Sequence, residues 1–235
     1  MTAAALMRQL EKVEQTQRVA RPPLEAEHDR RWRADCWAWV CEQVQTVDEA
    51  TQAVRPWPSD KHYLHELFVL FQTEKMLAIP KSRRMMLSWC LATYLSWRAR
   101  YFPHQLLLVQ SATEAKAAYL VGERCRFIEE HLRQPAYARP YRSWRTMQGL
   151  VGKIRYRSTG SEILSVAQGA DIVRSFTFSL LCMDEVEFQR EGSAALVAAL
   201  PAVEKGAQII LISTSNGPQG ALARLCQDVG FSRWT

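Results

Sequence analysis

The stretch from Met76 to Ser96 constrains the fold most, because its character changes twice within a short span. An apolar run over 76–79 stops at Pro80 and the basic residues that follow it, and a helix-forming segment begins near Ser88. This pattern indicates a strand, a tight basic loop and a helix. In nucleotide-binding α/β domains this arrangement binds phosphate through backbone N–H groups, with a lysine adding a point charge. The stretch therefore predicts a phosphate-binding loop.

The loop departs from the common pattern G-x-x-x-x-G-K-[ST]. Between Lys81 and Ser88 only the final hydroxyl, that of Ser88, is kept. Lys81 stands in place of the first glycine and Leu87 in place of the lysine. Met86 stands where a second glycine is usual, so we expect the loop to surround phosphate less closely. The loop alone does not establish nucleotide binding.

Two later apolar segments end in chemically active residues. Residues 176–183 lead into Asp184-Glu185, and residues 208–212 lead into Ser213-Thr214. Open α/β sheets gather ligand-binding residues at the carboxyl ends of their strands. The alternation of strands and helices predicts a parallel sheet with right-handed crossovers. Helices are expected over about residues 30–47, 59–71, 85–100, 114–132, 194–200 and 221–229, and further strands over 105–110, 153–157 and 161–166.

The loop and these two strand ends together resemble the ATPase domain of the large terminase subunit, the DNA-packaging motor of tailed bacteriophages. Some members of that family have a phosphate loop whose lysine comes first, in a Lys-Ser-x-Arg arrangement like that of residues 81–84. The resemblance covers about residues 57–220. It implies an α/β fold of the P-loop NTPase (ASCE) type, with a mainly parallel central sheet flanked by helices and a small N-terminal helical appendage.

The resemblance also divides the chain. It implies an N-terminal helical segment or lid over residues 1–55 and an ATPase domain over residues 56–230. In the family a ribonuclease-H-like nuclease domain follows about here, and too few residues remain after this point to form one. We therefore expect an excised ATPase domain without nuclease activity.

Phosphoryl transfer from ATP requires cations at the phosphates, a metal ion and a positioned water molecule. The resemblance implies that Lys81 reaches the β- and γ-phosphates from the opposite end of the loop to the usual lysine. Arg83 or Arg84 would add a second cation. The residues expected at the phosphates are Lys81, Ser82, Arg83, Arg84 and Ser88.

The acidic pair supplies the metal and water chemistry in this interpretation. Asp184 and the hydroxyl of Ser88 would bind Mg²⁺, and Glu185 would orient and deprotonate the attacking water. Adjacent acids on a strand point to opposite faces, but the end of a strand relaxes that constraint. The alternative is structural: the strand ends in solvated acids, or one of them caps the next turn.

The resemblance implies two further sets of residues at the nucleotide. In the family the segment before the loop holds the adenine, so Trp57, Tyr63 or Gln72 is expected to line that pocket, with core packing as the alternative. Ser213 and Thr214 resemble the coupling motif, on a strand expected between the other two. Their hydroxyls would sense the γ-phosphate and pass its loss to the DNA-gripping surface. A turn or a helix cap is the alternative.

Basic residues outside the loop have two expected roles. Arg174 lies where many terminases carry an arginine that completes a neighbouring subunit's site. Lys153, Arg155 and Arg157 alternate with apolar residues, which places them on one face of a strand. That face suits a phosphodiester backbone, with a solvated strand face as the alternative.

Composition agrees with these expectations. The net charge is +6 and the isoelectric point is about 9.1, which favours polyanionic partners. The six cysteines form no C-x-x-C pair, which indicates free thiols in a reducing cytosol. The sequence contains neither an apolar run of about 18 residues nor a signal-peptide pattern, so we expect a protein of the host cytoplasm without a membrane partner.

Three functions remain in competition. The first is an ATP- and Mg²⁺-dependent motor that moves double-stranded viral DNA, with the portal protein, the small terminase subunit and further copies of itself in a ring as the partners that the resemblance implies. The second is a helicase-like DNA remodelling ATPase. The chain after Gly220 is short for the second lobe of such an enzyme. The third is a non-catalytic module that binds DNA or the portal and has a decayed nucleotide site.

Overall fold

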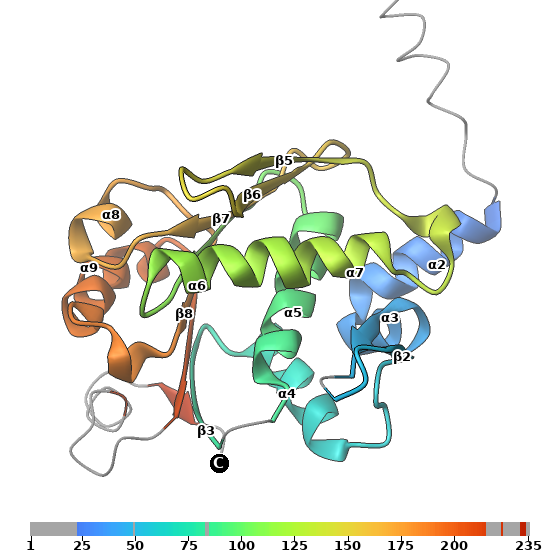
Figure 1. The fold of residues 1–235 in the computed structure, drawn as a ribbon, viewed down its shortest axis with the longest axis horizontal. Coiled ribbons are helices and arrows are strands. Elements are labelled where there is room, and N and C mark those ends of the chain that lie inside the picture. Colours follow the sequence, from blue (N-terminus) through green and yellow to red (C-terminus); the bar gives the residue numbers. More distant parts are fainter. Residues whose placement is uncertain (1–22, 49, 83–84, 215–221, 223–230, 234–235) are drawn as a thin grey trace, which may run out of the picture.

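The structure is a computed structural model that describes residues 23–48, 50–82, 85–214, 222 and 231–233 (Figure 1). Its helices are α2 (Pro23–Ala34), α3 (Cys36–Gln43), α4 (His62–Thr73), α5 (Leu87–Tyr101), α6 (Glu114–Tyr119), α7 (Arg126–Glu130), α8 (Ala170–Arg174) and α9 (Gly192–Glu204). A π-helical turn, η1 (Leu120–Cys125), joins α6 to α7, and two short 3-10 turns are η2 (Pro135–Tyr137) and η3 (Val186–Phe188).

One sheet organises the described residues. Its strands are β3 (Met76–Lys81), β4 (Leu106–Gln110), β5 (Tyr141–Arg145), β6 (Val151–Tyr156), β7 (Glu162–Val166), β8 (Leu180–Asp184), β9 (Gln208–Thr214) and β10 (Ser232–Arg233), and β1 (Gln45–Val47) pairs separately with β2 (Val54–Pro56). The spatial order is β10-β3-β9-β8-β4-β7-β6-β5. Strands β10 to β7 run parallel to their neighbours, whereas β6 and β5 extend the sheet antiparallel.

Helices cover both faces of this sheet, so the predicted α/β architecture with a mainly parallel sheet is confirmed. On one face, apolar residues of α3, α4, α5, η1 and α7 pack with the inward side chains of the strands. On the other face, α8 and α9 pack against side chains such as Leu181 and Leu211. Figure 1 shows α6, η1 and α7 as one long rod and places α8 and α9 together at one end of the molecule. Strand β9 lies between β3 and β8, as expected.

Several element boundaries differ from the prediction. The helix expected over 30–47 is broken at Asp35, whose side chain accepts a hydrogen bond from the Ala38 N–H and caps α3. Helix α9 continues through Pro201, which was expected to follow its end. The N–H that proline lacks would have bonded the Val197 carbonyl, and Val197 is exposed, so water can hydrate that carbonyl. The helix expected over 221–229 lies outside the described residues, apart from Leu222.

The strand predicted over 176–183 begins only at Leu180. Phe176 and Phe178 instead pack into the second core from an irregular segment. Cys36, Cys41, Cys90, Cys125 and Cys182 are free thiols, as predicted for these positions. None of the helices in the described ranges is long and apolar enough to cross a membrane.

Candidate active site

Strands β3, β9 and β8 end side by side at one edge of the sheet. The register places Lys81 beside Thr214 and Asp184 beside Ile212. Lys81 reaches across β9, so that its Nζ lies 3.2 Å from Oδ1 of Asp184. Both side chains are 14% exposed, which shields this ion pair from most of the solvent. Parallel pairing thus brings together residues that are far apart in the sequence.

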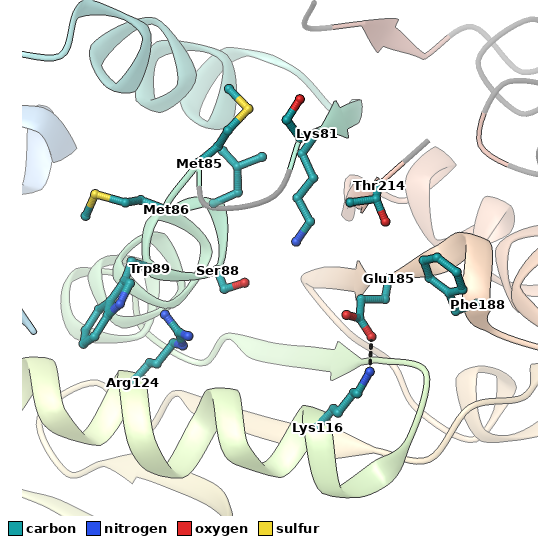
Figure 2. Close-up of a pocket in the computed structure, with 12 residues that line it drawn as sticks. Lys81, Met85, Met86, Ser88, Trp89, Lys116, Arg124, Glu185, Phe188 and Thr214 are labelled. Atoms are coloured by element: carbon teal, nitrogen blue, oxygen red, sulfur yellow. Dashed lines mark hydrogen bonds and ion pairs between the residues drawn. The ribbon is translucent and has the colours of Figure 1, made fainter. Parts of the chain in front are cut away.

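A cavity of about 510 Å³ opens at this edge (Figure 2). Its walls come from the end of β3, the start of α5, the α6–η1 rod, the turn after β8 and the end of β9. The lining residues are Lys81, Ser82, Met85, Met86, Leu87, Ser88, Trp89, Lys116, Arg124, Glu185, Phe188 and Thr214. The basic loop and the glutamate of the acidic pair, which the sequence analysis assigned to one site, therefore border the same space.

The loop enters α5 through an unusual backbone conformation. Met86 has a φ angle of 57°, in the left-handed region that favours glycine. This is the position where the common phosphate-loop pattern has its second glycine. Ser88 follows in the first turn of α5 and lines the cavity. Leu87 is only 2% exposed and packs into the core, so the usual position of the lysine carries an apolar side chain.

A second left-handed residue directs the acidic pair. Glu185 has a φ angle of 55°, and its N–H donates to Oδ1 of Asp184 at 3.0 Å. This turn after β8 lets both acids reach the same edge of the sheet, although adjacent residues on a strand would point apart. Oε2 of Glu185 accepts a hydrogen bond from Nζ of Lys116 at 2.6 Å, across the cavity mouth (Figure 2).

The two hydroxyl residues at the end of β9 have different surroundings. Thr214 lines the cavity, whereas the buried Ser213 accepts a hydrogen bond from the Glu187 N–H at 3.2 Å. Glu187 lies in η3, directly after the acidic pair. The strand end therefore joins the cavity to the turn that holds Glu185.

Several candidate residues are not brought to the cavity. Trp57 is 4% exposed and packs edge-on against Phe68, at 5.8 Å between ring centroids. The side chain of Gln72 bonds the Cys36 N–H and the Phe68 carbonyl, so it joins α3 to α4. Tyr63 packs against the core cluster. These are positions of core packing, the alternative given above, and none of these side chains lines the cavity in the described part of the chain.

Of the three candidate arginines, the structure describes only Arg174. Arg174 lies at the end of α8, on the surface, where it pairs with Asp171 at 2.9 Å. It does not line the cavity within this chain. Arg83 and Arg84 lie outside the described residues, so their expected contacts with phosphate stay predictions.

A second hollow of about 310 Å³ adjoins the cavity and shares Met86 and Trp89 with it. Its other walls come from the β1–β2 hairpin and the segment before α4. The lining residues are Thr46, Val47, Asp48, Arg55, Pro56, Pro58, Lys61, Met86 and Trp89. The segment before the loop thus does border a space near the site, through residues other than the three that were expected.

Two basic residues at the cavity were missed in the sequence. Lys116 lies in the first turn of α6, which follows β4, and Thr113 caps that helix by accepting from the Lys116 N–H. A helix that follows a parallel strand starts at the carboxyl edge of the sheet, so its first turn was a signal for Lys116. Arg124 lies in the π turn η1, which has no comparable signal in the sequence.

The oxygen ligands at this edge fit a magnesium ion bound together with phosphates. Mg²⁺ prefers oxygen and is usually held by one or two carboxylates plus substrate phosphates. Asp184 and Glu185 supply carboxylates, and Ser88 and Thr214 supply hydroxyls at the cavity. The described residues contain no cluster of three or more histidine, cysteine or acidic side chains that would bind a metal ion without such a substrate.

The basic strand face is partly neutralised. Lys153 and Arg155 both pair with Glu162 of β7, at 2.9 Å and 3.6 Å. The register also places Arg142 opposite Arg155 and Trp144 opposite Lys153 on β5. Trp144 is 43% exposed, and Nζ of Lys153 lies 5.1 Å from its ring centroid. Ile154 and Tyr156 lie on the opposite face of β6, as the alternation predicted, and both are buried.

No protein-family model matches the sequence, and no curated protein matches it. Solved structures match it in fold. The large terminase of bacteriophage HK97 superimposes with a TM-score of 0.61 at 12% identity, covering 84% of this chain and 41% of that one. The large terminase of a thermophilic bacteriophage gives a TM-score of 0.52 at 14% identity, covering 70% and 41%.

A further structure of the thermophilic phage enzyme, in complex with ATP-gamma-S, gives a TM-score of 0.51 at 13% identity and covers 70% of this chain and 40% of that one. At these identities the likeness shows the fold, and the resemblance found in the sequence is confirmed at that level. The chain spans 40% to 41% of the length of these structures.

Proposed function

We propose that this chain is an ATP-hydrolysing motor domain of the DNA-packaging terminase type. The observation that carries the proposal is that Lys81, Ser88, Glu185 and Thr214 border one cavity at the carboxyl edge of a parallel sheet, with Asp184 ion-paired to Lys81. Such an edge is where open α/β sheets bind ligands. The fold shared with large terminases, one of them solved with ATP-gamma-S, supports the same assignment.

The shape of the site suggests how a nucleotide would lie. The triphosphate would occupy the cavity between the loop and the acidic pair, close to the N-terminus of α5. The base would extend past Met86 and Trp89 into the adjoining hollow beside the β1–β2 hairpin. The two spaces share these side chains, so one extended ligand would contact both.

The protein's own groups would carry out the proton transfer. When bound, Mg²⁺ would neutralise phosphate charge, with Asp184 and Ser88 as its protein ligands. Lys81 would then release Asp184 and bind the phosphates instead. Glu185 would orient a water molecule and accept its proton. Its carboxylate would therefore have to break the hydrogen bond from Lys116, or accept from Lys116 and the water together. Thr214 would contact the terminal phosphate.

Loss of that phosphate would be transmitted along β9. Thr214 faces the cavity, and its neighbour Ser213 holds the Glu187 N–H in the turn after Glu185. A shift of the β9 end would therefore move η3. The Ser213-Thr214 pair would then have the coupling role that the resemblance implies.

Double-stranded DNA is the proposed polymer substrate. The face formed by Arg142, Lys153 and Arg155, with Arg157 just beyond it, would contact the phosphodiester backbone. The exposed Trp144 adds apolar area to this basic face. The portal protein, the small terminase subunit and further copies of this chain in a ring are the partners proposed for the working motor, with Arg174 reaching a neighbour's site.

Phosphate release from ATP and Mg²⁺, measured with and without duplex DNA, tests this function. Lys81→Ala and Glu185→Gln are each expected to lower turnover by about a hundredfold or more, because they remove a phosphate cation and the general base. Melting temperatures measured by circular dichroism should remain close to that of the wild type. Matched controls are Lys205→Ala and Glu191→Gln, which change exposed residues of the same types away from the cavity.

Unchanged turnover in both Lys81→Ala and Glu185→Gln would reject the assignment of these residues. A wild-type chain that neither binds nor hydrolyses ATP, with or without DNA, would favour the non-catalytic module instead.

A further inference from the structure

The cavity has a cation on the wall opposite the phosphate loop. Arg124 lines the cavity from η1, and Figure 2 shows its guanidinium directed towards Trp89 and the Ser88 side of the space. The loop itself has lost its usual lysine, because Leu87 takes that place and is buried. A phosphate at the start of α5 would therefore lie between the loop and the guanidinium of Arg124.

The π turn accounts for the position of Arg124. An α-helix from Glu114 to Glu130 would keep a regular repeat, whereas the wider turn over Leu120–Cys125, which contains Arg124, changes the directions of its side chains. Gly122 of the same turn lies against β6, where an added Cβ would come within 3.0 Å of the Val151 carbonyl oxygen. The rod thus lies close to the sheet at Gly122 and presents Arg124 to the cavity. Single π turns inside α-helices are frequent at functional sites.

Aromatic rings support the guanidinium at this place. Its Cζ atom lies 5.0 Å from the ring centroid of Trp89 and 6.0 Å from that of Tyr119. Contact with a ring face leaves the in-plane N–H groups of an arginine directed outwards, where they match two oxygens of a phosphate. Trp89 belongs to the first turn of α5, next to Ser88. The N–H edge of Arg124 is therefore held near the helix end that attracts anions.

The two lysines of the cavity are engaged with acids. Lys81 pairs with Asp184 and Lys116 pairs with Glu185, so each brings a balancing negative charge. A polyphosphate carries several negative charges and requires further cations. Arg124 lies across the cavity from this group, on the side shared with the adjoining hollow through Trp89.

We infer that Arg124 binds the phosphates nearest the ribose, the α- and β-phosphates of a nucleotide, and so adds a cation from outside the phosphate loop. The inference rests on the proposed nucleotide-binding function. Because ADP keeps these two phosphates, Arg124 contributes to the affinity for ADP as much as to that for ATP. Lys81, at the acidic end of the cavity, contributes more to the affinity for ATP than to that for ADP.

Calorimetric titration of the whole chain with ADP and with ATP-gamma-S, both with Mg²⁺, tests the inference. Arg124→Gln should weaken binding of both ligands about tenfold or more, and by similar factors, because a charged hydrogen-bond donor is lost. Arg124→Lys should restore part of the affinity, since it keeps the charge but not the planar fork. Arg126→Gln is the matched control: this residue lies on the same rod, pairs with Glu130 at 3.7 Å and does not line the cavity.

The outcomes separate the inference from the function beneath it. If the wild-type chain binds both nucleotides and Arg124→Gln binds them equally well, the role of Arg124 is rejected while nucleotide binding stands. Weakening of ATP-gamma-S alone would reject its placement at the α- and β-phosphates. Absence of binding by the wild type would reject the proposed function itself. Circular dichroism melting of each variant shows whether a loss of affinity reflects unfolding.

Discussion

Two ion pairs in this molecule join similar groups in different surroundings. Arg100 of α5 and Glu129 of α7 are enclosed in the core, with side chains that are 0% and 1% exposed. Lys116 and Glu185 meet at the mouth of the cavity, with side chains that are 56% and 32% exposed. The first pair is isolated from water, whereas the second is in contact with it.

The buried pair belongs to a network of hydrogen bonds. Nη1 of Arg100 lies 3.0 Å and 2.7 Å from the two carboxylate oxygens of Glu129, which also accept from the Tyr156 hydroxyl and the Arg139 N–H. Burial raises the pKa of Tyr156 well above its usual value, which keeps this hydroxyl a donor. The pair therefore ties α5 and α7 to β6 and to the segment before β5. The cavity pair has fewer contacts and is more exposed, which suits the opening that the proposed mechanism requires of it.

The largest expected effect comes from breaking the buried pair. Glu129→Gln leaves the Arg100 charge in the core without its counter-ion, which should lower the free energy of unfolding by about 3–5 kcal/mol. Urea denaturation followed by circular dichroism measures this. Glu130→Gln, at the neighbouring exposed position, should change it by less than about 1 kcal/mol.

A double variant sharpens this contrast. Arg100→Met with Glu129→Leu should recover part of the stability lost in Glu129→Gln, because neither charge then remains buried. The recovery is partial because the Tyr156 hydroxyl and the Arg139 N–H lose their acceptor. If Glu129→Gln unfolds at the same urea concentration as the wild type, the buried pair does not have the structural role given to it here.

A smaller effect is expected at the strand face, where a third group of ion pairs lies at intermediate exposure. Glu162 neutralises both Lys153 and Arg155. Glu162→Gln should release these cations and raise the affinity for a short duplex DNA several-fold, while Lys153→Gln with Arg155→Gln should lower it. The slope of log affinity against log salt should change by about 0.9 for each DNA phosphate that a variant newly neutralises or no longer neutralises.

Fluorescence anisotropy of a labelled duplex over a series of salt concentrations measures both quantities. Glu66→Gln, which removes an exposed acid on α4, controls for the change in net charge alone. Equal affinities and slopes for the Glu162 and Glu66 variants would remove this face from the proposed DNA contacts.

The parts of the site that the sequence predicted are those with a local signal. Lys81, Asp184 and Thr214 each follow an apolar strand, and parallel strands in one sheet bring such ends together whatever the loops between them do. The break at Asp35 was missed, because it depends on a side-chain hydrogen bond that the hydrophobic periodicity does not show. Local pattern therefore sufficed for the sheet and the acidic edge.

The residues missed or misplaced depend on tertiary packing. Trp57 and Gln72 have the right chemistry and sequence position for a base pocket. In the structure, however, Trp57 is buried in the core, and the side chain of Gln72 is hydrogen-bonded to the backbone of α3 and α4. Phe176 and Phe178 have the alternating spacing expected of a strand, but they belong to an irregular segment and pack into the second core. Arg124 reaches the cavity through a π turn, which no periodicity of the sequence specifies.

The smallest expected effect tests whether the backbone at Glu185 of the cavity pair is strained. Glu185 has a left-handed backbone, which disfavours a residue with a Cβ atom by about 1–2 kcal/mol. Glu185→Gly should therefore be more stable than Glu185→Ala by about 1 kcal/mol, since both lose the carboxylate and only glycine adopts this backbone without strain. Both variants should lack ATP hydrolysis. Urea denaturation of the two, side by side, measures the difference. Equal stabilities would mean that the folded protein does not hold this left-handed turn. The expected order would show that Glu185 is kept in a strained conformation, as is common for residues of functional sites.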